Sequence, residues 1–357
     1  MTRKPTVPTP CPGARPVPGS FLGRPFRRLG RDPQAVRAAV QVGFLALCLW
    51  TGVQFARFVH WGASAGRAGY VPHPAGAEAF LPISALLSLK HWALTGQVHP
   101  FHPAGLFFLL AALGTGLLLK KAFCSWICPV GTLGEWLWLL GRRLSGRTLT
   151  PPRWADYPLR SLKYLLLGLF LWAVWRMDGP VLAAFLDSPY NAVADVRMYG
   201  FFAHLSGLAL GVILALAGLS LVVPNAWCRY LCPYGALLGL LSLASPVRVT
   251  RSPATCIDCR KCTRACPARI QVHQAGRVGS DECTACYRCV AVCPVKDTLH
   301  VRVSGGRALP GWVFALMVTG LFLAVTGMAI LSGHWRTALT PQDYLELIPA
   351  AQNRVHP

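Results

Sequence analysis

Four stretches of the sequence are apolar, free of Asp, Glu, Lys and Arg, and long enough to cross a lipid bilayer as helices. They are residues 38–56, 102–119, 201–223 and 309–331. A membrane-spanning helix needs roughly 20 such residues, with a range of about 17 to 25. The composition agrees, because only 13% of the residues are charged, against about 25% in ordinary soluble domains. We therefore expect an α-helical integral membrane protein.

A fifth segment, 159–177, has an uncharged centre of only twelve residues, 164–175. That length suits either a span or an interfacial helix. The distribution of Lys and Arg favours a span, because these residues concentrate in cytoplasmic loops. With five spans and the N-terminus inside, 28 of the 35 basic residues fall on the cytoplasmic side and 7 outside. We therefore expect five transmembrane helices in the inner (cytoplasmic) membrane.

The same distribution explains the formal net charge of +22. Such a charge is also typical of nucleic-acid binding, but most of the basic residues lie where membrane topology accounts for them. We expect no nucleic-acid partner. The first apolar run is expected to be a span and not a signal peptide, because a Pro/Arg-rich tail of 37 residues, 1–37, precedes it.

Eight of the fourteen cysteines form two runs with the same spacing, C-x2-C-x2-C-x3-C-P. The first run is Cys256, Cys259, Cys262 and Cys266, and the second is Cys283, Cys286, Cys289 and Cys293. Both match the bacterial two-cluster ferredoxin pattern, in which the fourth cysteine of each run binds the other [4Fe-4S] cluster. Cluster one should take Cys256, Cys259, Cys262 and Cys293, and cluster two Cys266, Cys283, Cys286 and Cys289.

Two structural zinc sites are the alternative for these eight cysteines, since CxxC pairs also bind zinc. The third cysteine at equal spacing and the final Cys-Pro, both repeated, favour iron–sulfur clusters. Residues 247–303 thus resemble a bacterial-type ferredoxin domain with two [4Fe-4S] clusters, inserted on the cytoplasmic side.

A second motif, CxxxCP, occurs twice, 104 residues apart. It holds Cys124 and Cys128 in the first copy and Cys228 and Cys232 in the second, and each copy follows a predicted span. Residues i and i+4 share a helix face, so each pair should point in one direction. Three interpretations remain open for the four cysteines: a third redox centre holding a cluster or metal, a thiol/disulfide relay, or packing. Cys11 and Cys48 have no evident partners and are expected to be structurally unremarkable cysteines.

Ionisable residues gather in the predicted outer loop between the first two spans: Glu78, Lys90, His91, His99 and His102. Such groups can accept protons, hydrogen-bond a quinone head group or bind a metal, or they can simply be solvated loop residues. His204 differs, because it lies within an otherwise apolar span, where an ionisable side chain is a functional candidate.

The two CxxxCP motifs and the eight-cysteine block together resemble the membrane-bound 4Fe-4S polyferredoxins of the NapH/NosR type, over about residues 35–303. Segment 78–86, EAFLPISAL, also looks like a family element. The resemblance implies electron transfer from quinol towards a terminal reductase or a maturation step. The chain departs from the family in lacking the large outer flavin-binding domain of NosR-type members and in adding a fifth span with an outer tail.

These observations predict a tail (1–37), a four-helix membrane domain with both CxxxCP motifs (38–246), a ferredoxin domain (247–303), a fifth helix (309–331) and an outer tail (332–357). The predicted function is electron transfer between the quinone pool and a partner redox protein or reductase in the respiratory chain. The alternative is a membrane reductase or assembly factor that supplies electrons for copper or iron cofactor maturation. No catalytic nucleophile or nucleotide fingerprint is present, so we expect an electron-transfer subunit of quinol-dehydrogenase type and not a stand-alone enzyme.

Overall fold

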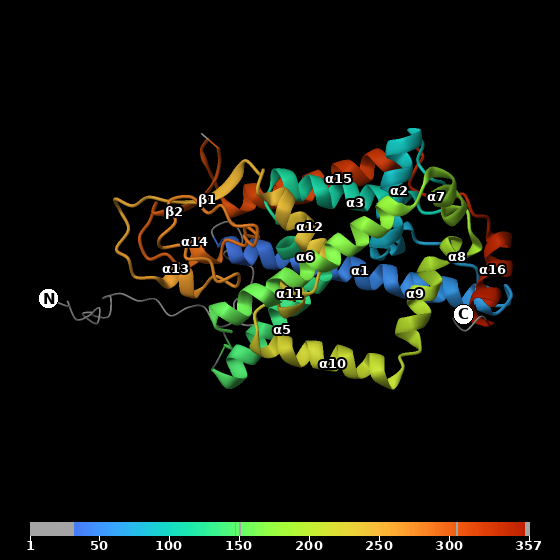
Figure 1. Ribbon diagram of the computed structural model, residues 1–357, viewed down its shortest axis with the longest axis horizontal. Helices are drawn as coiled ribbons and strands as arrows, with labels where there is room; N and C mark the ends of the chain where they lie inside the picture. The colour runs from blue at the N-terminus through green and yellow to red at the C-terminus, as the bar shows by residue number, and fades with distance from the viewer. Residues whose placement is uncertain (1–31, 147, 150, 305, 354–357) are drawn as a thin grey trace.

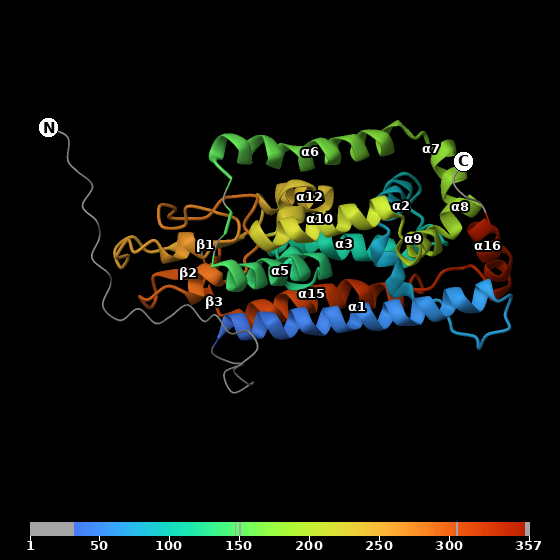
Figure 2. The same cartoon turned by 90° about the horizontal axis from the view of Figure 1, so that it is seen from below.

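The computed structural model describes residues 32–353 except 147, 150 and 305. Most of the predicted tail 1–37, including Cys11, therefore lies outside the described residues. The molecule is elongated (Figure 1), with the cysteine-rich domain at one end and a group of short helices at the other. Long helices run between the two ends, roughly along the longest axis (Figures 1 and 2).

A helix occurs at each of the five predicted spans. These helices are α1 (Pro33–Ala63), α3 (Pro103–Leu118), α6 (Arg153–Arg176), α10 (Gly207–Val222) and α15 (Gly311–Leu331). By length and hydropathy, α1 and α15 can each cross a membrane alone, whereas α3 has only 16 residues. Within the described residues, the number of candidate spans rises from two to four if α6 with α7 (Gly179–Leu186) and α9 (Ala194–Ala203) with α10 each count as one bent span.

The bend before α10 corrects the expected continuous helix over 201–223. α9 ends at Ala203, and α10 begins at Gly207 at an angle of 82°. The reason is local, because the Ser206 hydroxyl accepts a hydrogen bond from the backbone N–H of Ala209, 3.2 Å away. This N-cap starts a new helix. His204 lies in the break with its side chain exposed, so it is not inside an apolar helix.

The remaining helices have between 4 and 17 residues. They are η1 (Ala75–Phe80), α2 (Pro82–Thr95), α4 (Phe123–Trp126), α5 (Pro129–Ser145), α8 (Pro189–Ala192), α11 (Ala226–Tyr230), α12 (Pro233–Ser242), α13 (Lys261–Arg264), α14 (Arg288–Ala291) and α16 (Pro341–Asn353).

Large apolar side chains are exposed along the outward faces of the long helices. Examples are Trp50 on α1, Leu165 on α6, Leu214 on α10 and Leu316 on α15. Soluble monomers rarely expose apolar surface on this scale. Together with the spans, these faces suit contact with lipid and make the chain a membrane protein.

The cysteine-rich domain is closed by an antiparallel sheet. Its strands are β1 (Val247–Arg251), β2 (Leu299–Val303) and β3 (Ala308–Leu309), in the order β1-β2-β3. Val247 lies opposite Val303, and just beyond this pair the N–H of Ser304 donates to the carbonyl of Pro246 at 2.9 Å. The chain therefore enters and leaves this domain at one point.

Three aromatic rings join the domain to the helices. Trp126 of α4, Tyr287 of the second cysteine run and Phe314 of α15 lie with ring centroids 5.3–6.1 Å apart. All three side chains are buried. The domain and the ends of the long helices thus share one hydrophobic core.

Candidate metal centres

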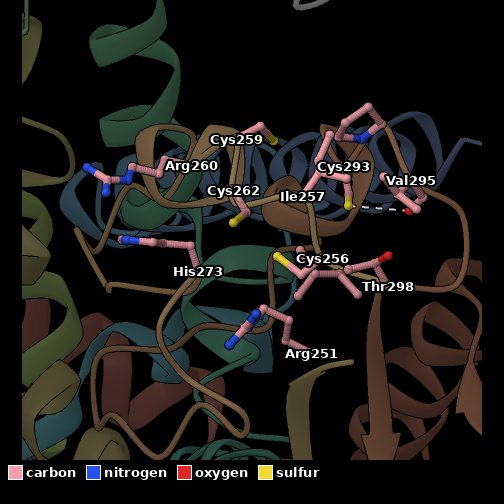
Figure 3. A pocket seen from close by; sticks show the side chains of 12 residues that line it. Arg251, Cys256, Ile257, Cys259, Arg260, Cys262, His273, Cys293, Val295 and Thr298 are labelled. Atoms are coloured by element: carbon pink, nitrogen blue, oxygen red, sulfur yellow. Dashed lines mark hydrogen bonds between the residues drawn. The ribbon is translucent and has the colours of Figure 1, made fainter. Parts of the chain in front are cut away.

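The first cavity of the domain is lined by Cys256, Cys259, Cys262 and Cys293 (Figure 3). The first three come from one run and the fourth from the other, which is the set expected for cluster one. Arg251, Arg260 and His273 also line this cavity.

The second cavity is lined by Cys266, Cys283, Cys286 and Cys289. This is the set expected for cluster two, again with three cysteines from one run and one from the other. Apolar side chains, among them Val249 and Ile270, complete the wall. The structure thus brings each predicted set together, and ligation of iron by these thiolates stays a prediction.

Both cysteine loops have the same unusual backbone. Asp258 and Arg260 flank Cys259 with positive φ angles of 50° and 57°, and Ala285 and Tyr287 flank Cys286 with 47° and 58°. Non-glycine residues rarely adopt this left-handed conformation. Alternating backbone conformations of this kind make concave nests of N–H groups that are found at many Fe–S sites. The residues therefore fit an anionic cluster in each cavity.

In the described part of the chain, no three Cys, His, Asp or Glu side chains lie close enough together to hold a single metal ion. The eight cysteines are spread instead around the walls of two cavities. A [4Fe-4S] cluster held by four cysteines suits that arrangement.

The two CxxxCP motifs fold alike. In each, a short helix, α4 or α11, is followed by a cysteine in extended conformation, Cys128 or Cys232, and by a proline at the first position of the next helix. Pro is favoured there because its missing N–H would be unpaired anyway. The N–H of Cys128 donates to the carbonyl of Phe123 at 2.9 Å, and Cys232 repeats this bond to Trp227 at 3.0 Å.

A glycine three residues after the second cysteine permits this turn in the first motif. A Cβ atom on Gly131 would lie 2.0 Å from the carbonyl oxygen of Cys124. Any larger residue would push α5 away from α4, so the glycine holds the two cysteines of the motif in place.

The four CxxxCP cysteines lie close enough together to act on one another electrostatically. Burial, together with the neighbouring Cys232, raises the pKa of the Cys124 thiol to about 12 and that of the Cys128 thiol to about 11. Burial, Cys232, Cys124 and Cys128 likewise raise the pKa of Cys228. Cys48 of α1 also lies near Cys128, since it too raises the pKa of that thiol. Sequence reasoning found no partner for Cys48, because α1 is separated from both CxxxCP motifs by more than 60 residues.

A buried lysine faces this group. Lys121 is only 2% exposed, and Cys124, Cys228 and Cys232 all interact with its charge. Its Nζ lies 3.6 Å from Oε2 of Glu282, which also binds Lys163. Buried charges need partners, and Glu282 directly precedes Cys283 of the second cavity.

The first CxxxCP motif is bonded to the loop of the second cavity. The Ser125 hydroxyl donates to the carbonyl of Thr284 at 2.8 Å, and the Trp126 indole Nε1 donates to that of Ala285 at 3.2 Å. The second motif is bonded to the same cavity, because Arg229 Nη1 donates to the carbonyl of Ala268, a lining residue, at 3.2 Å.

A buried ion pair reinforces this junction. Glu135 of α5 accepts hydrogen bonds from Arg37 of α1 at 2.6 and 2.7 Å and also pairs with Arg288 of α14. Burial by itself would raise the pKa of Glu135, but the two guanidinium groups outweigh it and lower the pKa to about 2. A carboxylate thus ties the domain to two helices.

Two family models match the chain. A 4Fe-4S binding domain matches residues 101–148 and again 204–251, once over each CxxxCP motif, and a 4Fe-4S dicluster domain matches residues 248–294. The putative electron transport protein YccM of Escherichia coli K12 is 42% identical over 340 residues, which are 94% of this chain and 95% of YccM.

The ferredoxin-type protein NapH of the same organism is 32% identical over 152 residues, covering 42% of this chain and 48% of NapH. The regulatory protein NosR of Pseudomonas aeruginosa is 30% identical over 185 residues, which are half of this chain and 24% of NosR. The chain belongs to the NapH/NosR-type polyferredoxins. No solved structure matches this polyferredoxin. Its 4Fe-4S binding domains make it an iron–sulfur protein.

At the opposite end of the polyferredoxin, two of the predicted outer-loop residues meet in a buried polar group. Glu78 is fully buried and accepts a hydrogen bond from the N–H of Gly105 at 2.9 Å, at the start of α3. The His102 Nε2 atom lies 2.6 Å from the carbonyl of Asn191. His102 Nδ1 and Glu78 Oε1 face each other at 3.9 Å without a hydrogen bond.

The other outer-loop residues of the polyferredoxin do not join this group. Lys90 donates to the carbonyls of Val174 and Trp175, at the end of α6, where a cation offsets the negative end of the helix dipole. His99 pairs with Asp187 at 3.1 Å, and His91 is half-buried with its ring against that of His99. Sequence reasoning missed a second buried pair here, His73 with Asp195 at 2.6 Å.

Proposed function

We propose that this polyferredoxin passes electrons between the quinone pool and a partner redox protein. The bound [4Fe-4S] clusters supply one-electron transfer at the two cavities. Oxidation of one quinol releases two electrons and two protons. Because each cluster accepts one electron, the two electrons leave the quinol one at a time. The first cavity would hold cluster one and the second cluster two, with the cysteine sets described above.

The observation that carries this proposal is the bonding between the first CxxxCP motif and the loop of cluster two. Ser125 and Trp126 belong to the motif, and their acceptors, Thr284 and Ala285, lie between two ligands of cluster two. A centre held by the CxxxCP cysteines, where the long helices meet the cysteine-rich domain, would therefore have a bonded connection to cluster two. Electron transfer between the membrane and that domain is the use such a connection serves best.

A third redox centre at Cys124, Cys128, Cys228 and Cys232 is part of the proposal. Packing alone does not require a buried lysine beside three of these thiols, whereas thiolates bound to iron carry negative charge that Lys121 would offset. The match of a 4Fe-4S binding domain over each motif supports iron there. Cysteines in buried apolar surroundings are poor nucleophiles without a metal, which disfavours a thiol/disulfide relay.

For the membrane arrangement, we propose five spans in the inner membrane with the ferredoxin domain, residues 247–303, in the cytoplasm. The tail 1–37 would lie inside and residues 332–357 outside. The basic residues support this orientation, 28 inside against 7 outside. The bent pairs α6–α7 and α9–α10 would each supply one crossing, and α3 would cross as a short helix.

The test is reduction of the full-length protein in lipid nanodiscs by a quinol analogue, kept anaerobic. We expect duroquinol to bleach the visible cluster absorbance and to produce the EPR signal of reduced [4Fe-4S] clusters, at a rate well above that in quinol-free buffer. Clusters that respond to dithionite but not to duroquinol would overturn the proposal. Stoichiometric reduction of Cu²⁺ or Fe³⁺ by the isolated protein, after its clusters are reduced with dithionite and the excess is removed, together with no quinol turnover, would favour a reductase that serves metal-cofactor maturation.

A further inference from the structure

We propose that the surface around the first cavity is the docking site for an acidic, water-soluble redox protein, and that electrons are exchanged with it through cluster one. We call this surface the cavity-one face. It consists of Arg251, Ile257, Arg260, Lys261, Arg264 and Lys296. The proposal rests on the proposed function, because it requires that the two clusters carry electrons.

The order of the two cavities along the molecule is the first argument. The loop of the second cavity takes hydrogen bonds from Ser125, Trp126 and, at the carbonyl of Cys286, from Gln34 Nε2 at 2.8 Å. It is therefore held against α1 and α4. The loop of the first cavity is bonded within its own domain, where Arg264 Nη2 donates to the carbonyl of Cys259 at 3.0 Å.

The short helices confirm this order. α14, which carries Cys289 of the second cavity, contacts both α1 and α13, and α13 carries Cys262 of the first cavity. Cavity two thus lies on the side of the membrane helices, and cavity one lies further out. A soluble partner reaches the outer cavity without displacing any helix.

The exposure of the cavity-one face is the second argument. Ile257 lines the cavity yet is 56% exposed, although isoleucine is among the residues most often buried. The Arg260 side chain, beside Cys259, is 65% exposed. An exposed apolar residue surrounded by charged ones has the composition of a small interface, with an apolar centre and a polar rim.

The charge of the face identifies its partner. The face has five basic residues, whereas only two acidic residues, Asp258 and Asp297, are its neighbours in the sequence. Complementary charge steers two proteins into contact and selects the correct partner. The occupant that fits is a redox protein with an acidic surface around its own cofactor.

Charged inorganic oxidants test the face on the full-length, cluster-loaded protein. The protein is reduced with dithionite, freed of excess reductant and mixed by stopped flow with the anionic cobalt(III)–EDTA complex or the cationic tris(phenanthroline)cobalt(III) complex. The double variant Arg260→Glu with Lys296→Glu should slow oxidation by the anion roughly ten-fold and speed oxidation by the cation. Added salt should weaken both effects.

The matched control is Arg302→Glu with Arg307→Glu. It makes the same charge change at two exposed residues near the β2–β3 turn, away from the cavity-one face. We expect less than about a two-fold change with either oxidant. Equal effects of the two double variants, or no effect of the first, would overturn the docking face.

Cys259→Ser supplies a second, independent measurement. With cluster one lost, transfer to the anionic oxidant should fall to the background rate while EPR still detects a reducible cluster two. Undiminished transfer would mean that electrons leave elsewhere and would overturn the proposal. Because these experiments start from dithionite-reduced protein, their outcome does not depend on whether quinol is the physiological reductant, so the two proposals can fail separately.

Discussion

The indole Nε1 of Trp126 donates a hydrogen bond to the backbone carbonyl of Ala285, 159 residues further along the chain and 3.2 Å away. Trp126 lies between Cys124 and Cys128, and Ala285 lies between Cys283 and Cys286. One hydrogen bond thus connects the interiors of two different cysteine motifs.

Replacing Trp126 by Phe removes this bond and keeps most of the ring packing. A buried hydrogen bond contributes about 1 kcal/mol, and the orphaned carbonyl adds to the loss. We expect a lower temperature for thermal bleaching of the cluster absorbance and slower quinol-driven reduction of the ferredoxin clusters. Trp138→Phe is the control, because it loses only a 3.4 Å bond from Nε1 to Thr148 and keeps an aromatic ring beneath Arg288. Equal behaviour of the two variants would contradict a special role for Trp126.

Cys259→Ala should lose cluster one and Cys286→Ala cluster two, each seen as the loss of about four of the irons in anaerobically purified protein. Cys266→Ala tests whether the fourth cysteine of the first run binds cluster two. Although Cys266 belongs to the first run, it lines the second cavity, so its variant should match Cys286→Ala in EPR. A match with Cys259→Ala would show that ligation is not crossed, and zinc in place of iron would refute the cluster assignment.

Cys128→Ser and Cys232→Ser should each abolish quinol-linked electron transfer and leave both ferredoxin clusters spectroscopically intact. The reason is that the four CxxxCP cysteines would hold one centre, and residues that act as a unit are not additive. The double variant should therefore be no worse than either single one. Normal transfer in either single variant would mean that these cysteines only pack.

Glu135→Gln removes the carboxylate shared by Arg37 and Arg288. Breaking a buried ion pair costs about 3–5 kcal/mol, because the remaining charges stay buried without compensation. We expect a large loss of thermal stability and easier proteolytic release of the domain. Asp258→Asn is the control, because its pair with Arg260 is exposed and 4.0 Å long; its effect should stay within about 0.5 kcal/mol.

The same residue predicts a pH dependence. The pKa of Glu135 is about 2 in the folded protein, below its ordinary value of 4.5. A lowered pKa means that the ion pair stabilises the fold fully above pH 4.5 and progressively less as the pH falls towards 2. The stability difference between the native protein and Glu135→Gln should therefore shrink over that interval. A constant difference would contradict the assigned ion pair.

Reporter fusions after residues 150, 190, 300 and 350 should read inside, outside, inside and outside. The expectation follows from the distribution of Lys and Arg. The fusion at residue 190 is the informative one, because it follows the bend between α6 and α7. An inside result there would turn that pair into a re-entrant segment and contradict the five-span arrangement, because the remaining crossings would then put on opposite sides of the membrane two CxxxCP motifs that lie together in the structure.

Local spacing explains what could be predicted from the sequence. The grouping of cysteines around each cavity follows from distances of three or four residues plus one long-range partner, Cys293 or Cys266, which the ferredoxin pattern supplies. The helices at the five apolar segments follow from hydropathy alone. In both cases the signal lies in neighbouring residues.

Contacts between distant segments could not be predicted in the same way. Lys121 and Glu282 are 161 residues apart, and the residues next to each of them in the sequence do not indicate that they pair. The continuous apolar run 201–223 predicts one helix, whereas the structure breaks it before Gly207. The Ser206 hydroxyl caps a new helix there, and hydropathy does not detect such a cap. Lys90 was grouped with possible ligands, yet its ammonium caps a helix that is more than 80 residues away.

The bond between Ser304 and Pro246 has a consequence for how such chains can vary. Because the domain begins and ends at adjacent points, its removal leaves α12 and α15 positioned to be joined by a short turn. A module attached in this way can be lost, doubled or exchanged by a single recombination event without changing the path of any helix. The membrane helices and the insert can therefore evolve as separate parts only as far as their shared core around Trp126 and the ion pairs of Glu135 and Glu282 are kept.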